Sequence, residues 1–143
     1  MAIVYLGIGS NMGNRLHNIK EAIRLLQQNS IKLLKQSTII ETDPVGGPPQ
    51  DKYLNGVLKI ETTLEASELL KTLKNIESTL GRIKTVKDGP RPIDIDILIY
   101  DNLKLSTPEL IIPHPEMLKR DFVLIPLKEI EPKLVAELTH ADR

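Results

Sequence analysis

GPRPIDIDILIY, residues 89–100, alternates isoleucine with aspartate directly after a Gly-Pro-Arg-Pro segment. Successive side chains of a β-strand point to opposite faces, so this alternation predicts a strand with one apolar face and one acidic face. The apolar face is expected to carry Ile93, Ile95, Ile97 and Ile99. Aspartate is depleted in strands, so Asp94 and Asp96 occupy positions that strand propensity alone disfavours. The sequence therefore predicts a core strand whose two acids serve another purpose.

Asp94 and Asp96 suggest a site for a divalent cation. Residues two apart on a strand are separated by about 6.6 Å, and like charges at that distance repel by roughly 2.5 kcal/mol at an effective dielectric near 20. A divalent cation turns this repulsion into attraction. Oxygen ligands without His or Cys beside them favour Mg²⁺ or Mn²⁺ over zinc. The alternative is a solvent-facing strand whose acids pair with nearby lysines.

The composition is that of a neutral chain without cysteine. The chain has 143 residues, with 19 basic and 19 acidic side chains. This length suits a single domain over residues 1–143. The balanced charge argues against nucleic acid or an anionic membrane as the main partner. The lack of cysteine suits the cytosol, and neither a signal peptide nor a membrane span is recognisable, so we expect a soluble cytoplasmic protein.

Helical and extended patterns alternate along the chain. Apolar spacing predicts helices near 16–26 and 69–80, the second closed by Gly81. Extended patterns predict strands at 3–8, 31–42, 55–63, 93–100 and 122–125, with a short strand or turn at 103–105. The order β-α-β-β-α-β predicts a ferredoxin-like α+β sandwich, in which helices pack on one face of a mainly antiparallel sheet. The other face is then open for a ligand.

Two loops are longer than a compact domain needs, and such loops are usually functional or disordered. Residues 42–53 are rich in proline and glycine. Residues 81–92 contribute four cations, which are Arg82, Lys84, Lys87 and Arg91. Cations beside a metal-binding acidic pair are what a polyphosphate bound with Mg²⁺ requires. The alternative is a solvated basic loop that balances the acids through surface ion pairs, each worth only about 0–1 kcal/mol.

Two polar features interrupt otherwise ordinary patterns. GIGSNMG (7–13) has neither the dinucleotide-binding nor the P-loop spacing, so we interpret it as a tight turn in which Ser10 and Asn11 satisfy backbone donors locally. Glu77 lies on or beside the apolar stripe of the second helix, where an unpaired carboxylate is costly. It is expected to reach the edge of the helix or to meet a donor on a ligand.

The few aromatic residues are also informative. Tyr53 and Phe122 are a pair of rings that suits stacking on a flat heterocycle, although core packing is the default for Phe122. His114 lies between two prolines and by itself favours a structural role over a catalytic one.

Four segments together resemble the 6-hydroxymethyl-7,8-dihydropterin pyrophosphokinase family of folate biosynthesis. They are LGIGSNMGNR (6–15), ETDPVGGPPQDKYLN (41–55), GPRPIDIDIL (89–98) and PHPEMLKRDFVLIPL (113–127). The resemblance runs over nearly the whole chain in the correct order. It implies transfer of the β,γ-diphosphate of ATP to the hydroxymethyl oxygen of the pterin, with release of AMP. It also implies two Mg²⁺ ions, and we expect a monomer.

The resemblance also implies roles for individual residues. Asp94 and Asp96 match the positions that hold the Mg²⁺ ions, and with Arg82 and Arg91 they form the implied catalytic group. The implied pterin-binding residues are Thr42, Pro44, Val45, Tyr53, Asn55 and Phe122. The implied ATP-binding residues are Glu77, Lys84, Lys87, Arg91, Ile97, His114 and Arg120.

The chain departs from the pattern of better-known family members mainly at implied nucleotide contacts. The departures are Lys74, Lys84, Lys87, Asp88, Glu109 and Ile111. Lysine presents a point charge where arginine clamps two phosphate oxygens, so we expect changed ATP affinity rather than a changed reaction.

Other classes of function remain open at this point. A ferredoxin-like domain can be a non-catalytic pterin-binding or nucleotide-binding module, because fold does not fix function. RNA binding is disfavoured, since the chain lacks an aromatic-rich strand motif and a basic excess. A Mg²⁺-dependent nuclease would need further acids or a general base near the pair, and the sequence does not identify them.

Overall fold

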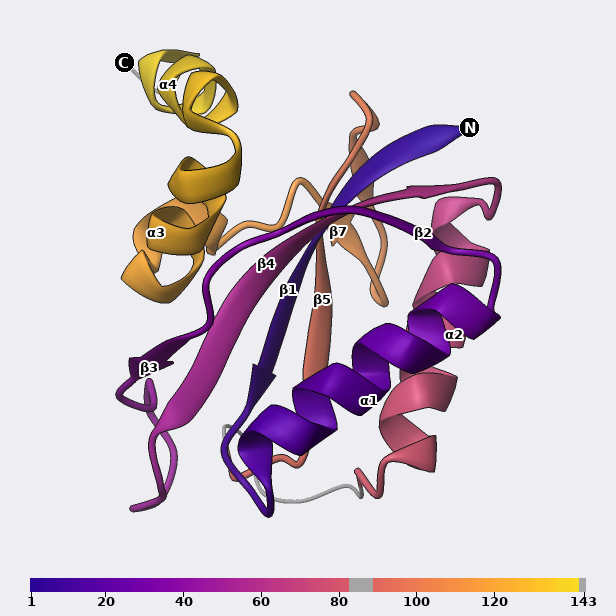
Figure 1. Cartoon of the computed structure of the whole chain (residues 1–143). Coiled ribbons are helices and arrows are strands. Elements are labelled where there is room, and N and C mark those ends of the chain that lie inside the picture. Colours follow the sequence, from indigo (N-terminus) through magenta and orange to yellow (C-terminus); the bar gives the residue numbers. More distant parts are fainter. Residues whose placement is uncertain (83–88, 142–143) are drawn as a thin grey trace.

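The computed structural model describes residues 1–82 and 89–141 of the chain. A central β-sheet carries helices on both faces (Figure 1). The strands are β1 (Ala2–Ser10), β2 (Lys32–Gln36), β3 (Ile40–Thr42), β4 (Tyr53–Thr62), β5 (Asp94–Tyr100), β6 (Leu105–Ser106) and β7 (Ile111–Ile112). The helices are α1 (Arg15–Gln28), α2 (Ala66–Thr79), α3 (Asp121–Ile130) and α4 (Pro132–Ala141), with a short 3₁₀ turn at Met117–Lys119.

The main sheet is antiparallel and has the strand order β2-β4-β1-β5, with β3 paired to β4. The predicted α+β fold with a mainly antiparallel sheet is confirmed. The single strand expected at 31–42 is divided into β2 and β3. At the break, the hydroxyl of Ser37 accepts the N–H of Val57 (2.8 Å). The short strand expected near 103–105 is β6, which forms a hairpin with β7.

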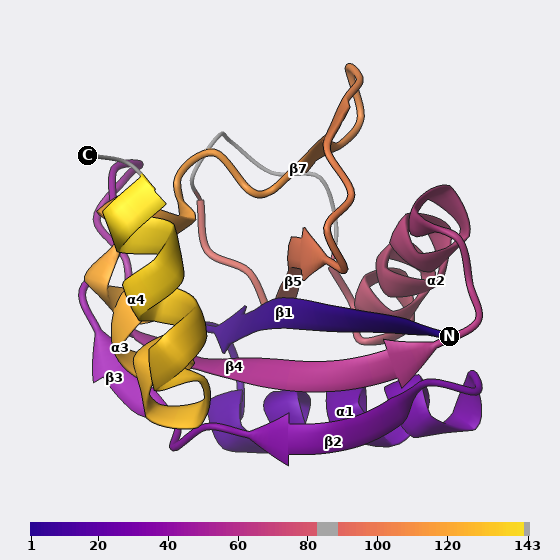
Figure 2. The ribbon, with the colours of Figure 1, turned by 90° about the horizontal axis from the view of Figure 1, so that it is seen from above.

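Helices α1 and α2 pack on the same sheet face, as predicted (Figure 2). Their buried residues recur at spacings of three and four, as in Leu69, Leu73 and Ile76 of α2. The side chain of Asn14 caps α1 by accepting the N–H of His17 (3.1 Å). Gly81 follows α2 with φ +92°, a conformation that favours glycine and ends the helix.

The opposite sheet face is covered in part by α3 and α4, which Figure 2 shows on the other side of the sheet from α1. The strand predicted at 122–125 is wrong, because these residues belong to α3. Val123 and Leu127, one helical turn apart, are buried against the sheet, so tertiary packing selects the helix over the local β-propensity. In the described part of the chain, no helix is long and apolar enough to span a membrane.

The isoleucine face of β5 also needs a correction. Ile93, Ile95 and Ile97 lie in the core beneath α1 and α2, as predicted, but Ile99 lies in the core beneath α3 and α4. The pairing of β1 with β5 shifts register at this point, so that Leu98 is an extra residue on β5. Such a bulge reverses the alternation of side chains beyond it. The face assignment therefore holds only as far as Ile97.

Candidate active site

Two cavities meet at the acidic pair of β5. The first, the sheet-face cavity, has a volume of about 260 Å³ and is lined by β1, β4, β5 and the start of α3. The second, the helix-side cavity, lies beside α2 and β7. Both are lined by Arg91, Asp94, Asp96 and His114. A ligand in one cavity therefore lies next to a ligand in the other, with two carboxylates between them.

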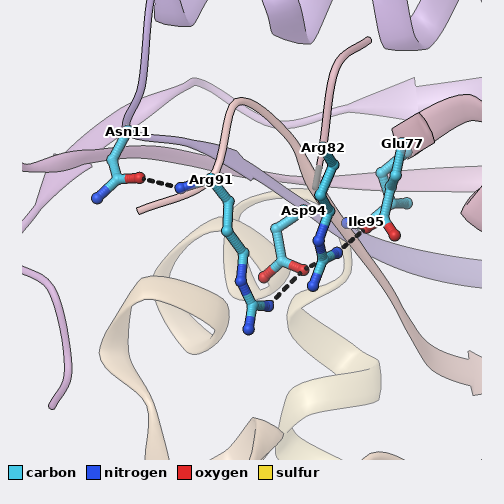
Figure 3. A network of polar contacts seen from close by, with 6 residues as sticks. All are labelled: Asn11, Glu77, Arg82, Arg91, Asp94 and Ile95. Atoms are coloured by element: carbon cyan, nitrogen blue, oxygen red, sulfur yellow. Dashed lines mark hydrogen bonds and ion pairs between the residues drawn. The ribbon is translucent and has the colours of Figure 1, made fainter. Parts of the chain in front are cut away.

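Asp94 pairs with two arginines in the described part of the chain, rather than with lysines (Figure 3). Its Oδ1 lies 3.1 Å from Nη1 of Arg82 and 3.3 Å from Nη1 of Arg91. Its side chain keeps 25% of its surface exposed, so it remains open to the cavities. The basic loop thus places at least these two guanidinium groups beside Asp94.

Asp96 differs from Asp94 because its carboxylate has no ion pair within residues 1–82 and 89–141. Burial raises the pKa of Asp96 to about 7, and the negative charges of Asp94 and Glu77 add to the effect. Arg82 and Arg91 oppose the shift but do not cancel it. The acid therefore carries incompletely compensated charge, which a bound cation would relieve.

Glu77 is buried, so the expectation that it reaches the edge of α2 is wrong, while a contact with a ligand donor stays a prediction. Its carboxylate accepts the N–H of Ile95 on β5 (2.9 Å) and forms an ion pair with Arg82. Burial raises the pKa of Glu77, while the Ile95 N–H and Arg82 act in the opposite direction. Glu77 thus connects α2, Arg82 and the edge of β5.

Asn11 also differs from its prediction, since its partners are distant in the sequence. Its Nδ2 donates to Oε1 of Gln50 (2.8 Å) and to the carbonyl of Asp51 (3.0 Å). Its Oδ1 accepts the N–H of Arg91 (2.8 Å). The hydroxyl of Ser10 is buried and has no hydrogen-bond partner among the described residues. The predicted local role of this turn is therefore wrong for both residues.

All residues that the resemblance assigned to the pterin line the sheet-face cavity. These are Thr42, Pro44, Val45, Tyr53, Asn55 and Phe122. The hydroxyl of Thr42 and Nδ2 of Asn55 are joined by a 2.6 Å hydrogen bond, which fixes the amide of Asn55. The structure thus brings two aromatic rings and a fixed amide to one cavity.

The residues assigned to ATP are divided between the two cavities. Glu77, Arg91, Ile97 and His114 line the helix-side cavity, together with Arg82 of the implied catalytic group and the departures Lys74, Glu109 and Ile111. Arg120 instead lines the sheet-face cavity, with its guanidinium 5.6 Å from the ring centre of Phe122. Lys84, Lys87 and Asp88 lie outside the described residues.

His114 is held in place by its neighbours on the chain. Its Nδ1 accepts the main-chain N–H of Glu116 (3.1 Å), and the main-chain N–H of His114 donates to the carbonyl of Leu98 (2.9 Å). Burial lowers the pKa of His114, and the charge of Arg120 adds to the effect. The imidazole is therefore favoured in its neutral form, as a hydrogen-bonding group rather than a cation.

Gly9 is a site residue that the sequence interpretation missed. A Cβ built on Gly9 would lie 2.4 Å from Oδ1 of Asn55, so the glycine leaves room for that amide. Gly9 pairs with both Asn55 and Asp94 across the sheet. The glycine-rich segment GIGSNMG was the available signal, but a missing side chain shows its purpose only once its neighbours are known.

The comparisons with known proteins agree on one family. The family model described as 7,8-dihydro-6-hydroxymethylpterin-pyrophosphokinase matches residues 5–132. The 2-amino-4-hydroxy-6-hydroxymethyldihydropteridine pyrophosphokinase of Bacillus subtilis is 43% identical, over 98% of this chain and 84% of that protein. The protein of the same description from Aquifex aeolicus is 45% identical, over 94% and 84% respectively.

Longer relatives and solved structures extend this result. A bifunctional mitochondrial folate synthesis protein of Arabidopsis thaliana is 42% identical over 89% of this chain, which spans only 23% of that protein. A solved structure of an HPPK-DHPS protein in complex with substrates superposes with a TM-score of 0.70, over 92% of this chain and 42% of that one. At 16% identity, that likeness shows the fold alone. On the family model and the curated relatives together, the chain belongs to the 7,8-dihydro-6-hydroxymethylpterin-pyrophosphokinase family.

Proposed function

We propose that this chain transfers the β,γ-diphosphate of ATP to 6-hydroxymethyl-7,8-dihydropterin and releases AMP, a step of folate biosynthesis. The observation that carries the proposal is the meeting of two cavities at Asp94 and Asp96. One cavity takes the acceptor and the other takes the donor. Holding both reactants in contact converts a bimolecular step into an effectively unimolecular one.

The sheet-face cavity is the proposed pterin site. The rings of Tyr53 and Phe122 line it, and aromatic rings stack favourably on a flat heterocycle. Asn55 and Thr42 supply amide and hydroxyl groups that hydrogen-bond the edge of the pterin. Such polar groups make the cavity selective, because a ligand without matching hydrogen-bonding groups leaves them unpaired.

The helix-side cavity is the proposed nucleotide site. β5 is an edge strand, and the N–H of Ile95 points away from β1 toward Glu77. Ile97 lies two residues further along β5 and also lines this cavity, so strand alternation predicts that its N–H and carbonyl face the same side, where they can bind the hydrogen-bonding edge of a purine. Leu70 and Ile111 provide apolar walls for the base. Arg91 and Arg82 lie where the phosphates would reach the acids.

The acidic pair fits Mg²⁺ bound together with nucleotide. The pair offers carboxylate oxygens, and the described residues contain no group of three or more His, Cys, Asp or Glu that could hold a metal by itself. Mg²⁺ is typically held by one or two carboxylates, with substrate phosphates and water completing an octahedron. We therefore propose that Asp94 and Asp96 bind the two Mg²⁺ ions that the family resemblance implies. Bound Mg²⁺ would neutralise phosphate charge and make the pterin hydroxyl easier to deprotonate.

In this mechanism the side chains of the protein position and stabilise the reactants and form few or no covalent bonds with them. The hydroxymethyl oxygen gives up its proton to water and forms a bond to the β-phosphorus. The bond from that phosphorus to the oxygen that bridges it to the α-phosphate breaks, and this oxygen leaves with AMP. Arg82 and Arg91 stabilise the charge that develops on the transferred group.

The organisation of the chain is part of the proposal. The strand order β2-β4-β1-β5 supports the expected ferredoxin-like arrangement, with β3 as an additional short strand. Both cavities are built within the described residues, which supports a single catalytic domain over residues 1–143 that acts as a monomer.

The decisive assay incubates the protein with ATP, Mg²⁺ and 6-hydroxymethyl-7,8-dihydropterin and measures AMP and the pterin diphosphate. We expect AMP from the wild type and none from Asp96→Asn, which should still bind the pterin. Glu21→Gln, which removes a partly exposed acid paired with Arg24 on α1, serves as the control and should retain activity. Pterin binding without AMP in the wild type would instead favour the non-catalytic module.

A further inference from the structure

The end of helix α2 brings Arg82 back onto the helix that precedes it. The N–H of Gly81 donates to the carbonyl of Ser78 (3.1 Å), and the N–H of Arg82 donates to the carbonyl of Glu77 (3.0 Å). This pair of bonds, with Gly81 at φ +92°, is a Schellman motif. The position of the Arg82 backbone is therefore fixed by the helix end itself.

The side chain of Arg82 then bridges two carboxylates. Its Nη1 forms an ion pair with Oε2 of Glu77 and lies 3.1 Å from Oδ1 of Asp94 (Figure 3). Glu77 cannot easily move away, because it is buried and accepts the N–H of Ile95 (2.9 Å). Arg82 is thus attached to Glu77 through both its main chain and its side chain, and its guanidinium lies against the proposed metal ligand.

We propose that Arg82 and the metal ion compete for the carboxylate of Asp94, so that the arginine acts as an exchangeable internal counter-ion. This inference rests on the proposed function, which makes Asp94 a metal ligand. A divalent cation bound to Asp94 lies within a few ångströms of a guanidinium on the same carboxylate. Like charges at that distance repel strongly inside a protein, so the two cations exclude one another.

Arg91 provides a natural comparison, because it also contacts Oδ1 of Asp94. Its Nη1 is farther away, at 3.3 Å, and no ion pair links it to Glu77 within the described residues. Arg91 can therefore lean away from Asp94 without leaving a second, buried carboxylate unpaired. Arg82 occupies the position between the two acids, and its displacement is what binding of the metal requires.

Displacement leaves Arg82 close to the reaction. Its main chain remains bound to Glu77, and its side chain remains in the helix-side cavity, where the phosphates of the nucleotide would lie. The guanidinium released from Asp94 then has a new anionic partner in the phosphates. One residue thereby neutralises the acids before the metal binds and the phosphates afterwards.

The first test measures Mn²⁺ binding without nucleotide, from the electron paramagnetic resonance signal of the free ion. Removal of the competing guanidinium in Arg82→Gln is expected to lower the Mn²⁺ Kd by about tenfold. Arg91→Gln removes the same charge from the same oxygen and is expected to have a clearly smaller effect. Arg24→Gln, an exposed pair on α1, is the control and should leave the Kd unchanged.

The second test uses the wild-type protein and does not depend on a variant that folds. Addition of Mg²⁺ without nucleotide should shift the side-chain Nε–Hε resonance of Arg82 in a ¹H–¹⁵N spectrum, and that of Arg91 less.

The outcomes separate the two proposals. If Mn²⁺ binds but Arg82→Gln does not tighten it, or tightens it no more than Arg91→Gln does, competition is wrong and the proposed function stands. If the wild type and every variant fail to bind free Mn²⁺, and with a nonhydrolysable ATP analogue bind no more Mn²⁺ than the analogue does alone, the metal assignment itself is wrong, and the competition with it.

Discussion

Asn11 and Arg91, 80 residues apart in the sequence, exchange two hydrogen bonds. The N–H of Asn11 donates to the carbonyl of Arg91 (3.1 Å), and the N–H of Arg91 donates to Oδ1 of Asn11 (2.8 Å). The amide of Asn11 also holds Gln50 and Asp51, at the end of the proline-rich and glycine-rich loop. One buried side chain therefore fixes the wall of the sheet-face cavity relative to an arginine of the acidic pair.

We expect Asn11→Ala to impair both stability and catalysis. The variant leaves the N–H of Arg91 and the carbonyl of Asp51 without their buried partner, which should lower the free energy of unfolding by about 1–3 kcal/mol. Because Arg91 and the loop then move independently, AMP formation should fall even where the protein remains folded. Denaturant unfolding and AMP formation below the melting temperature measure the two effects.

Asn29→Ala provides the control for Asn11. Within the described residues, its side-chain amide donates to the carbonyl of Leu25 at the end of α1 (2.7 Å), in an exposed hydrogen bond. We expect a loss of stability well below that of Asn11→Ala and unchanged AMP formation. An equal loss of AMP formation in both variants would contradict a specific role for Asn11.

Gly9→Ala should weaken pterin binding selectively. The new Cβ would lie 2.4 Å from Oδ1 of Asn55 and 3.3 Å from the carbonyl of Leu54, so the amide of Asn55 must move. We expect the Kd of the pterin to rise by about tenfold, equivalent to 1.4 kcal/mol, with ATP binding little changed. Isothermal titration with each ligand separately measures both values.

Gly7→Ala is the matched control, since Gly7 lies two residues earlier on the same strand. Its Cβ would meet Leu98 at 3.6 Å, an ordinary van der Waals distance. Its effect on pterin binding should be clearly smaller. Because Gly7 also lines the sheet-face cavity, a similar loss in both variants would mean that an added methyl group on this strand, rather than movement of the Asn55 amide, weakens pterin binding.

Much of the central sheet could be predicted because its signals are local. The alternation in residues 93–97 and the apolar stripe of α2 each specify one element and the face that it buries. The residues that the family motifs assigned to the pterin also line one cavity, since the backbone of the fold fixes their relative positions. The roles of these residues remain proposals.

The remaining features depend on contacts between distant segments. No pattern in the sequence near Leu98 indicates the bulge that places Ile99 in the core beneath α3 and α4. α3 was mistaken for a strand because Phe122 and Val123 favour extended structure locally, whereas the sheet selects a helix. Glu77 and Asn11 were misinterpreted for the same reason, since their partners Ile95 and Gln50 lie in other elements.

Glu131 should make the stability of the fold depend on pH. The hydrogen bond from Lys35 (2.9 Å) lowers the pKa of Glu131 below its ordinary value of 4.5; burial opposes this shift and Lys59 reinforces it. A carboxylate with a lowered pKa stabilises the fold above its unfolded-state pKa, and this stabilisation is lost as the pH falls through the folded-state pKa. Two such pairs contribute about 0.4–2 kcal/mol.

The free energy of unfolding of Glu131→Gln at pH 7 is therefore expected to be lower than that of the wild type by about 0.4–2 kcal/mol. The difference should narrow below about pH 4.5 and vanish in stronger acid, where the wild-type carboxylate is protonated too. Urea unfolding at a series of pH values gives both curves. A difference that stays constant into strong acid would show that Glu131 does not act through its charge.

Glu129 should affect pterin binding from a distance, because it joins α3 to the segment before β3. Its carboxylate accepts the N–H of Thr38 (2.9 and 3.0 Å) and the hydroxyl of Thr38 (2.9 Å). α3 carries Phe122 at its start, and β3 ends at Thr42, so this contact sets the separation of two walls of the sheet-face cavity. Loss of the contact in Glu129→Ala should let α3 move away from the sheet.

We expect Glu129→Ala to raise the pterin Kd by roughly three- to tenfold, about 0.7–1.4 kcal/mol, while the ATP Kd stays near the wild-type value. The helix-side cavity shares no residue of α3, so it should be unaffected. Glu137→Ala, an exposed acid on the neighbouring α4, is the control and should change neither Kd. If Glu129→Ala weakened both ligands equally, the cause would be a general loss of structure, and α3 would not position Phe122 through this contact.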